Sequence, residues 1–286
     1  MADYGKNFVQ LHNHTHYSLL DGASKIPDLA KRAAELEMPA VGITDHGNMH
    51  GAYEMYTNCV ANGVKPIIGI EAYVTPETAR QDKSRVHWGT EAQRRDDVSG
   101  GGLITHLTMW AENDEGLVNL IKASSVANLE GRVMRYPRMD KEVLSTYSKG
   151  VIASSGCPSG IIQTRLRLGQ FDEALRAAGE FQDIFGKDNF FIELMDHGLT
   201  IENQVTDDLL TIAKKLDAPL LATNDSHYVH AEDAGAQDAM LCINSGSRLD
   251  DPDRFKFDGT GYYIKTAEEM RELFKDHPDA CDNTLL

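Results

Sequence analysis

The stretch LHNHTHYSLLDG, residues 11 to 22, combines closely spaced histidines with the end of an apolar run. His12 and His14 are two residues apart, so on an extended strand both side chains leave the same face and can bind one ion. Asp21 lies past an expected turn and is a third candidate ligand. His16 would share the face of His14 only if the strand continued, so we place it outside the ligand set.

Short apolar runs like the one before this motif recur along the chain and predict seven strands. They are FVQLH (8 to 12), AVGIT (40 to 44), IIGIEAYV (67 to 74), LITHLTMW (103 to 110), VIASS (151 to 155), FFIEL (190 to 194) and PLLATN (219 to 224). Segments with an apolar stripe of helical period lie between them, at residues 26 to 36, 115 to 129, 171 to 185 and 203 to 216. This alternation predicts an α/β fold with a parallel sheet, either a barrel or a doubly wound sheet.

Nine potential metal ligands lie where these strands are expected to end. They are His12, His14, Asp21, His46, Glu71, His106, Cys157, Asp225 and His227. In a closed parallel barrel the loops that follow the strands form one rim, so these side chains would converge there. Nitrogen, oxygen and sulfur donors together suit zinc, manganese or iron, and nine donors are too many for one tetrahedral ion. The sequence therefore predicts a multinuclear metallohydrolase.

Two of the nine have a local argument of their own. Asp45 and His46 end an apolar strand in ITDHGNMHG, residues 43 to 51, where a core strand has no use for adjacent ionisable groups. We assign His46 as a ligand and Asp45 as a residue that orients an imidazole or a water. Glu71 lies amid apolar and small residues, where an isolated charge is costly. Shared metal ions would compensate this charge; pairing with a lysine or an arginine is the alternative.

Later segments continue the series. Cys157 follows the fifth expected strand in a tight turn, which favours ligation over the usual role of a buried cysteine as a small hydrophobe. Asp225 and His227, in ATNDSHYVH, repeat the spacing of the first motif. After the sixth strand, Asp196 and His197 are candidate substrate contacts, with helix capping or surface packing as the alternative.

Composition limits the class of protein. The chain has 286 residues, of which 41% are hydrophobic and 25% charged, enough for one α/β barrel or two small domains. No apolar run approaches the ~20 residues that cross a bilayer, and the first residues show no signal-peptide core, so we expect a cytoplasmic protein with no membrane partner. Four widely spaced cysteines argue against a disulfide framework. A net charge of −16 argues against a protein that coats nucleic acid.

Two segments depart from the alternating pattern. Residues 76 to 102 form a long polar loop whose basic residues, Arg94 and Arg95 among them, either contact substrate or belong to a solvated surface. Residues 247 to 286 contain a hairpin-like stretch, RFKFDGTGYYIK, and a helix-like AEEMRELFKD. We place the barrel at residues 1 to 246 and regard 247 to 286 as an extension that leads toward a further region of a longer protein.

Taken together, these motifs resemble the polymerase and histidinol phosphatase (PHP) domain family. The HxH, TDHG, Glu, His, Cys and NDxH blocks occur in the order of that family between residues 8 and about 230. Within the family, KPIIGIEAYV, GCPSGIIQTRLRLGQ, MDHGLTIE, LATNDSHYV and RFKFDGTGYYIK most resemble the amino-terminal domain of bacterial replicative DNA polymerase III alpha subunits, in the actinobacterial form. The resemblance implies a distorted seven-stranded (β/α) barrel.

The resemblance also implies a site and an activity. His12, His14, Glu71 and Asp225 would bind one divalent ion, Glu71 would bridge to a second ion held by His106 and Cys157, and Asp21, His46 and His227 would hold a third. Zinc is the first candidate for these two to three ions, with manganese or iron as alternatives. The implied activity is a 3′ to 5′ exonuclease that proofreads the primer end of DNA, with Glu71, Asp225, His227 and Asp45 as its catalytic set.

The implied partners are DNA, the remainder of the polymerase III alpha subunit and the replisome. Two other functions stay open: a metal-stabilised scaffold without catalysis, and a phosphatase of small molecules such as histidinol phosphate. Nothing in the chain resembles a polymerase palm with paired catalytic aspartates, so we expect no primer extension by these 286 residues.

Overall fold

The computed structural model describes residues 7 to 93 and 101 to 286. The chain forms two compact units. Unit 1 comprises Met1–Ile68, Met195–Leu199 and Ala222–Leu286, and unit 2 comprises Gly69–Leu194 and Thr200–Leu221. Strand β2 (Lys65–Val74) contributes its first residues to unit 1 and the rest to unit 2.

Unit 1 is mainly helical around one short parallel pair of strands. Its elements are α1 (Ile26–Glu35), β1 (Ala40–Ile43), α2 (Ala52–Ala61), η2 (Ala231–Asp233), α9 (Ala234–Ser245), α10 (Ala267–Leu273), α11 (Pro278–Asp282) and η3 (Asn283–Leu285). Strand β1 pairs with residues 65 to 68 of β2. Apolar residues of α1 at helical spacing, such as Ile26, Leu29 and Ala33, are fully buried in one core cluster with Val41 of β1 and Met55 of α2.

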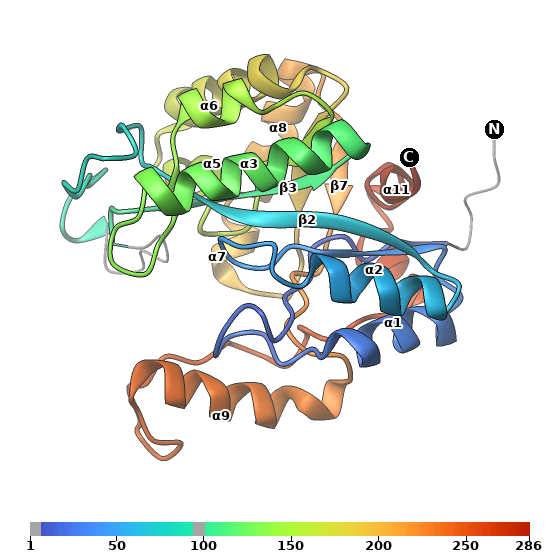
Figure 1. The fold of residues 1–286 in the computed structure, drawn as a ribbon. Helices are drawn as coiled ribbons and strands as arrows, with labels where there is room; N and C mark the ends of the chain where they lie inside the picture. The colour runs from blue at the N-terminus through green and yellow to red at the C-terminus, as the bar shows by residue number, and fades with distance from the viewer. Residues whose placement is uncertain (1–6, 94–100) are drawn as a thin grey trace. The chain divides into compact units, whose positions relative to one another are not determined.

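Unit 2 holds most of the sheet and its covering helices. Its elements are the remainder of β2, β3 (Thr105–Ala111), α3 (Asp114–Glu130), β4 (Arg138–Met139), α4 (Lys141–Thr146), β5 (Val151–Ser154), α5 (Ile161–Arg167), α6 (Phe171–Phe185), β6 (Phe190–Leu194), α7 (Thr200–Asn203), α8 (Thr206–Leu216) and the start of β7 (Leu220–Ala222). Hydrogen-bonded strands follow the order β1-β2-β3-β5-β6-β7, with β4 beside β2. Helix α3 packs against β3 and β5 (Figure 1).

The sheet is mixed, whereas we expected it to be parallel. Strand β3 runs antiparallel to both β2 and β5, while β5 and β6 are parallel. No described helix lies between β2 and β3, and a loop alone suffices to connect antiparallel neighbours. The long loop after residue 75 is therefore the connection that reverses the chain direction. The four helices expected from apolar periodicity are all present, as α1, α3, α6 and α8.

Six of the seven expected strands are formed; the first, at residues 8 to 12, is not a strand. The side chain of Asn13 takes over bonds that a strand ladder would use, because its amide donates to Gln10 O and Gly42 O at 2.8 and 2.9 Å. Only isolated bridges remain, from Asn13 to Ser226 and from Thr15 to Ser24. Strand β4, which we did not predict, brings the number of strands back to seven.

The hairpin expected at residues 254 to 265 is also absent, while the helix expected after it is α10. Backbone groups of this stretch bind residues 224 to 229 instead of each other: His227 N donates to Tyr262 O at 2.8 Å, and Ile264 N donates to Val229 O at 3.3 Å. The sequence of this stretch is typical of a hairpin, but its backbone hydrogen bonds go to the segment that follows β7.

Among the described residues, no helix has the length and apolar character that crossing a membrane requires. All four cysteines are buried, and none of them forms a disulfide bond.

Gly42 fixes the distance between β1 and the segment before His12. A Cβ atom at Gly42 would lie 2.4 Å from Leu11 O, a backbone atom that cannot yield without moving its whole segment. We expect Gly42→Ala to lower the free energy of unfolding by about 1–3 kcal/mol, as overpacking does. Chemical denaturation would measure it.

Gly179→Ala in α6 is the matched control, because the nearest atom to its added Cβ would be 3.9 Å away. The free energy of unfolding of that variant should rise by up to ~1 kcal/mol, because alanine has a higher helix propensity than glycine. Equal effects of the two variants would contradict the close-approach argument.

Candidate metal centre

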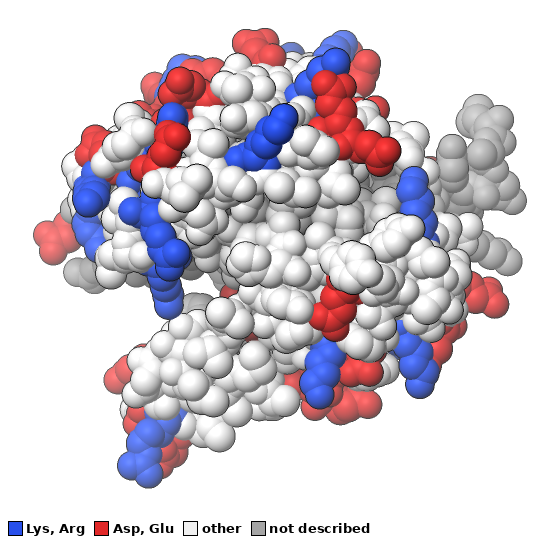
Figure 2. Space-filling model, in the orientation of Figure 1, with Lys and Arg blue, Asp and Glu red and all other residues white. Residues whose placement is uncertain are grey.

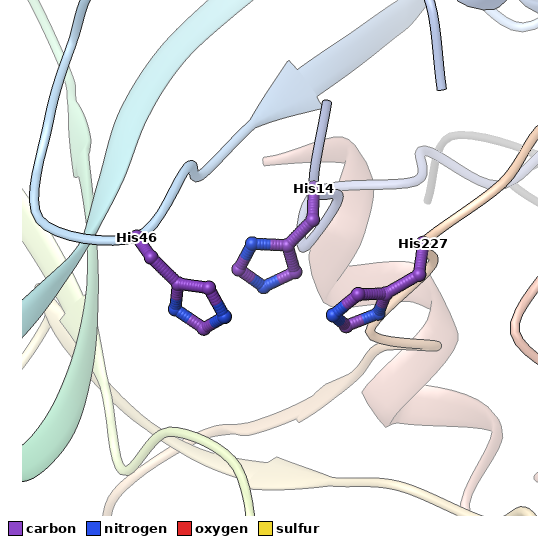
Figure 3. Close-up of side chains that lie close together, drawn as sticks. All are labelled: His14, His46 and His227. Carbon is purple, nitrogen blue, oxygen red and sulfur yellow. The ribbon is translucent and has the colours of Figure 1, made fainter. Parts of the chain in front are cut away.

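Unit 1 brings six of the nine candidate ligands together. His12 and His14 lie in the segment before α1, and Asp21 lies in the turn between that segment and α1. His46 follows β1, and Asp225 and His227 follow β7. Nitrogen atoms of His14, His46 and His227 all lie within 4.8 Å of one another. Figure 3 shows these three rings turned toward a common space.

Two carboxylates connect the histidines. Asp225 Oδ1 lies 3.4 Å from His12 Nε2 and 3.1 Å from His14 Nε2. Asp21 Oδ2 lies 2.9 Å from His46 Nε2 and 3.6 Å from His227 Nε2. Each carboxylate thus faces two imidazoles, which is the mixed nitrogen and oxygen donor set that suits zinc, manganese or iron.

Hydrogen bonds fix which nitrogen can act as a ligand in His14 and in His227. Ser18 Oγ donates to Asp45 Oδ1 at 2.7 Å, so it accepts from His14 Nδ1 at 2.9 Å. The lone pair of His14 is therefore on Nε2, the atom that faces Asp225. His227 Nδ1 donates to the carbonyl of Asp225 at 2.8 Å, which leaves its Nε2 facing Asp21.

The electrostatics of the cluster favour a neutral His14 beside two ionised carboxylates. Burial, helped by His46 and His227, lowers the pKa of His14 to about 3, so this ring is neutral at pH 7. Burial alone would raise the pKa of Asp225 and of Asp21, but the histidines that face them lower both pKa values below the usual range. Ligands must be deprotonated to bind metal, and these groups already are.

Asp45 supports this cluster through hydrogen bonds with Thr15 and Ser18. It accepts from Thr15 N at 2.7 Å and Thr15 Oγ1 at 2.8 Å as well as from Ser18. Burial raises its pKa despite these hydrogen bonds. Ser18 also accepts from the backbone N of His46 at 3.1 Å, so one hydroxyl links Asp45 to the His14 ring and to the backbone of His46. This geometry fits the orienting role that we gave Asp45. Ser18 was not among the candidate residues that we named from the sequence.

Asp225 has a backbone φ of 43°, in the left-handed region that residues other than glycine rarely adopt. Its neighbour Asn224 is held by Lys265, whose Nζ donates to Asn224 Oδ1 at 2.5 Å and to Gly261 O. The Asn224 amide donates in turn to Gly261 O and Tyr263 O at 3.0 and 2.8 Å. Lys265 is buried, and only its position after the aromatic pair Tyr262 and Tyr263 could have drawn attention to it.

Unit 2 brings the other three candidate ligands together. Glu71 lies within β2 and is fully buried, with its Oε2 3.1 Å from His106 Nδ1. Cys157 Sγ lies 3.4 Å from the same nitrogen. His106 is at the beginning of β3, not at its end as we expected, because β3 runs antiparallel to β2 and β5. The turn that carries Cys157 is attached to β3 by a bond from His106 N to Ser159 O.

The predicted substrate contacts have mixed placements. His197 Nε2 donates to Asn224 O at 3.0 Å and its ring stacks on Tyr262 at 4.2 Å, while Asp196 accepts from Gly198 N at 2.9 Å within a turn. Both side chains thus have structural contacts, as in the packing alternative. Arg94 and Arg95 lie outside the described residues. Arg80, from the same long loop, is bound to Glu130, Asp140 and Glu142.

Histidines outside the predicted set lie apart from the cluster. His16 is 39% exposed and faces Glu54 at 3.9 Å, and His50 is exposed. His230 is the N-cap residue of the short helix η2, and its backbone N donates to Asp233 Oδ2 at 3.0 Å. The spacing argument therefore separated the clustered histidines of unit 1 from their neighbours in sequence.

A family model for the PHP domain matches residues 10 to 197, and the chain belongs to this family. It is 55% identical over 283 residues to DNA polymerase III subunit alpha of Mycobacterium tuberculosis (strain H37Rv), covering 99% of this chain and 24% of that protein. The subunit of Saccharopolyspora erythraea is 56% identical over 287 residues, with 98% and 24% covered. The chain thus spans about a quarter of the length of these relatives. The resemblance and the fold class expected from the sequence are confirmed.

Solved structures with a similar fold are more distant. An amidohydrolase from Chromobacterium violaceum is 14% identical, with a TM-score of 0.46, and the match covers 77% of this chain and 87% of that one. A two-domain protein from Bacteroides vulgatus, said to contain a predicted PHP-like metal-dependent phosphoesterase, is 13% identical with a TM-score of 0.43, covering 99% and 64%.

The hydrogen bonds around Asn224 predict a role for Lys265 in holding the Asp225 turn. Lys265→Met keeps the length of the side chain but leaves the buried Asn224 Oδ1 without its lysine donor, which costs about 1–3 kcal/mol. We expect a lower free energy of unfolding and weaker binding of zinc, measured by denaturation and by competition with a chromophoric chelator. Lys275→Met, which removes an exposed ion pair with Glu272, should change neither. Zinc affinity that is unchanged in Lys265→Met would contradict this role.

Proposed function

We propose that this chain is a metal-dependent phosphodiesterase domain that removes nucleotides from the 3′ end of DNA, as a 3′ to 5′ exonuclease. The observation that carries the proposal is the convergence of four imidazoles and two carboxylates in unit 1 of a PHP-family chain. Membership of the family and the relation to polymerase subunits support a phosphoesterase-type domain. The removal of nucleotides from a DNA 3′ end goes beyond this class of domain and is our proposal.

The donor sets fit divalent metal ions. Unit 1 offers imidazoles, two of them in defined tautomers, beside ionised carboxylates. In unit 2, Glu71 Oε2 and Cys157 Sγ both lie within 3.4 Å of His106 Nδ1. We propose that the nine residues hold two to three ions, zinc first and manganese or iron as alternatives. Bound ions would supply Lewis-acid stabilisation of the charge that develops on phosphate oxygens.

The residues of the chain provide the rest of the chemistry in this proposal. Asp21 and Asp225 bring the negative charge that attracts the ions and keep their neighbouring rings oriented. Asp45, through Ser18, fixes His14 in the tautomer that leaves Nε2 available. We propose Glu71, Asp225, His227 and Asp45 as the catalytic set, with Asp45 acting through its neighbours.

Recognition of DNA needs local features in this acidic chain. On the face drawn in Figure 2, acidic and basic side chains are interspersed and form no extended basic surface. Arg94 and Arg95 stay proposed phosphate contacts, and Asp196 and His197 stay proposed substrate contacts. We propose the remainder of a polymerase III alpha subunit and its replisome as partners, because the relatives at this level of identity are such subunits. We also propose a cytoplasmic location.

Metal content tests the first part of the proposal. We expect the purified chain to bind two or three divalent ions, measured by elemental analysis, and its melting temperature to fall when a chelator removes them. A ligand at 100 times its dissociation constant stabilises the native state by roughly 2.7 kcal/mol. At most one bound ion, with melting unaffected by chelator, would contradict the proposed ligand set.

Substitution of Asp225 tests catalysis. Asp225→Asn removes an anionic ligand with little change of shape, and asparagine also tolerates the left-handed backbone at this position. We expect hydrolysis of a mismatched DNA primer to fall on the order of a hundredfold or more, as when several kcal/mol leave the transition state. Glu71→Gln should have a similar effect.

His16→Ala is the control, because His16 belongs to the same motif but lies outside the cluster. It should keep the activity of the unmodified chain. Equal rates in all variants would assign the activity to a contaminant and favour the scaffold function. If histidinol phosphate is hydrolysed and the primer is not, the phosphatase alternative is correct.

A further inference from the structure

Aromatic rings connect the surface of unit 1 with the candidate metal centre. We call Phe255, Phe257 and Tyr262 the aromatic track. Phe255 is 60% exposed, and its ring centroid lies 6.1 Å from that of Phe257. The Phe257 ring lies 4.7 Å from Tyr262 and, edge to face, 4.7 Å from His227. An exposed ring is thereby joined by one intermediate ring to a proposed ligand.

Packing holds the segment of the aromatic track in place. Arg254, immediately before Phe255, forms two hydrogen bonds with Asp238 of α9 at 2.5 and 2.7 Å. Its Nε also donates to Leu249 O at 3.2 Å. At the other end, Tyr262 is buried and stacks on His197. A ring that is already held in place loses little conformational freedom when a ligand binds to it.

The residues around Phe255 suit an unpaired nucleotide chain. Single-stranded nucleic acids bind proteins by stacking their bases on aromatic side chains and by placing phosphates beside cations. Lys256 is exposed between the two phenylalanines and places a cation in the same segment. Isolated exposed hydrophobic residues are common on protein surfaces, but Phe255 belongs to a series of rings that ends at a proposed metal ligand.

We infer that the aromatic track is a stacking surface for the terminal bases of single-stranded DNA, and that it brings the last phosphodiester toward His227. This inference rests on the proposed phosphodiesterase function and names its substrate: a frayed, unpaired 3′ end. Stacking accepts any base, because every base has a π face. Selection of a mismatched end would then follow from its lower cost of unpairing.

The test measures binding without turnover. The probe is a short single-stranded oligonucleotide, labelled at its 5′ end, whose 3′-terminal linkages are phosphorothioates that resist hydrolysis. Fluorescence anisotropy gives its Kd for the full 286-residue chain and for Phe255→Ala, and we expect Phe255→Ala to weaken binding roughly fivefold to a hundredfold. Phe255→Tyr keeps a ring and should restore the affinity. A second probe, lacking the last bases, should bind the unmodified chain and Phe255→Ala equally.

Leu249→Ala is the matched control, since Leu249 is 59% exposed in the same segment and has no ring. It should leave the Kd unchanged. Equal Kd values for Phe255→Ala and the unmodified chain, or equal loss with both probes, would overturn the inference, as would failure of Phe255→Tyr to restore binding. Absence of DNA binding by the unmodified chain would also overturn the inference.

Hydrolysis of an unmodified oligonucleotide is measured separately. Binding that depends on bases without any hydrolysis would retain the stacking surface and reject the phosphodiesterase function. Hydrolysis without dependence on bases would do the reverse.

Discussion

The backbone pairing of residues 12 to 14 with Ser226 is the constraint on which the cluster in unit 1 depends. His14 N donates to Ser226 O at 2.8 Å, and Ser226 N donates to His12 O at 3.1 Å. This parallel bridge sets two motifs of the same spacing side by side, so the side chains of both project to one face. Asp225 can therefore face His12 and His14 although the two motifs lie near opposite ends of the chain.

Burying this many ionisable groups is tolerable only because their charges compensate one another. Neutral His14 adds no charge, while Asp225 and Asp21 raise the pKa of His227 above its usual value although burial opposes them. A divalent ion would replace that compensation with a stronger one. The left-handed backbone of Asp225 belongs to the same arrangement, since Lys265 and Asn224 hold the turn in a conformation that the chain alone would disfavour.

Spacing and apolar runs predicted most elements and the proximity of several candidate ligands, because both depend on short-range geometry. An i, i+2 pair shares a face wherever the chain is extended, so His12 and His14 could be assigned even though their segment is not a strand. The direction of β3 could not be predicted, since a strand has the same periodicity in either direction. Ser18 and Lys265 were missed because their roles depend on partners that only folding brings near.

Under the proposed function, a negatively charged chain must bind a polyanion, so the groups that attract DNA and the groups that recognise its bases must differ. Phosphate contacts weaken as salt rises, and with a net charge of −16 the chain as a whole repels DNA. Carboxylates such as Asp21 add to that repulsion until metal ions neutralise them, so loading with metal would precede productive binding of substrate. Stacking on Phe255 involves no net charge and is not screened by salt, which makes it the contact that an acidic protein can use at any ionic strength.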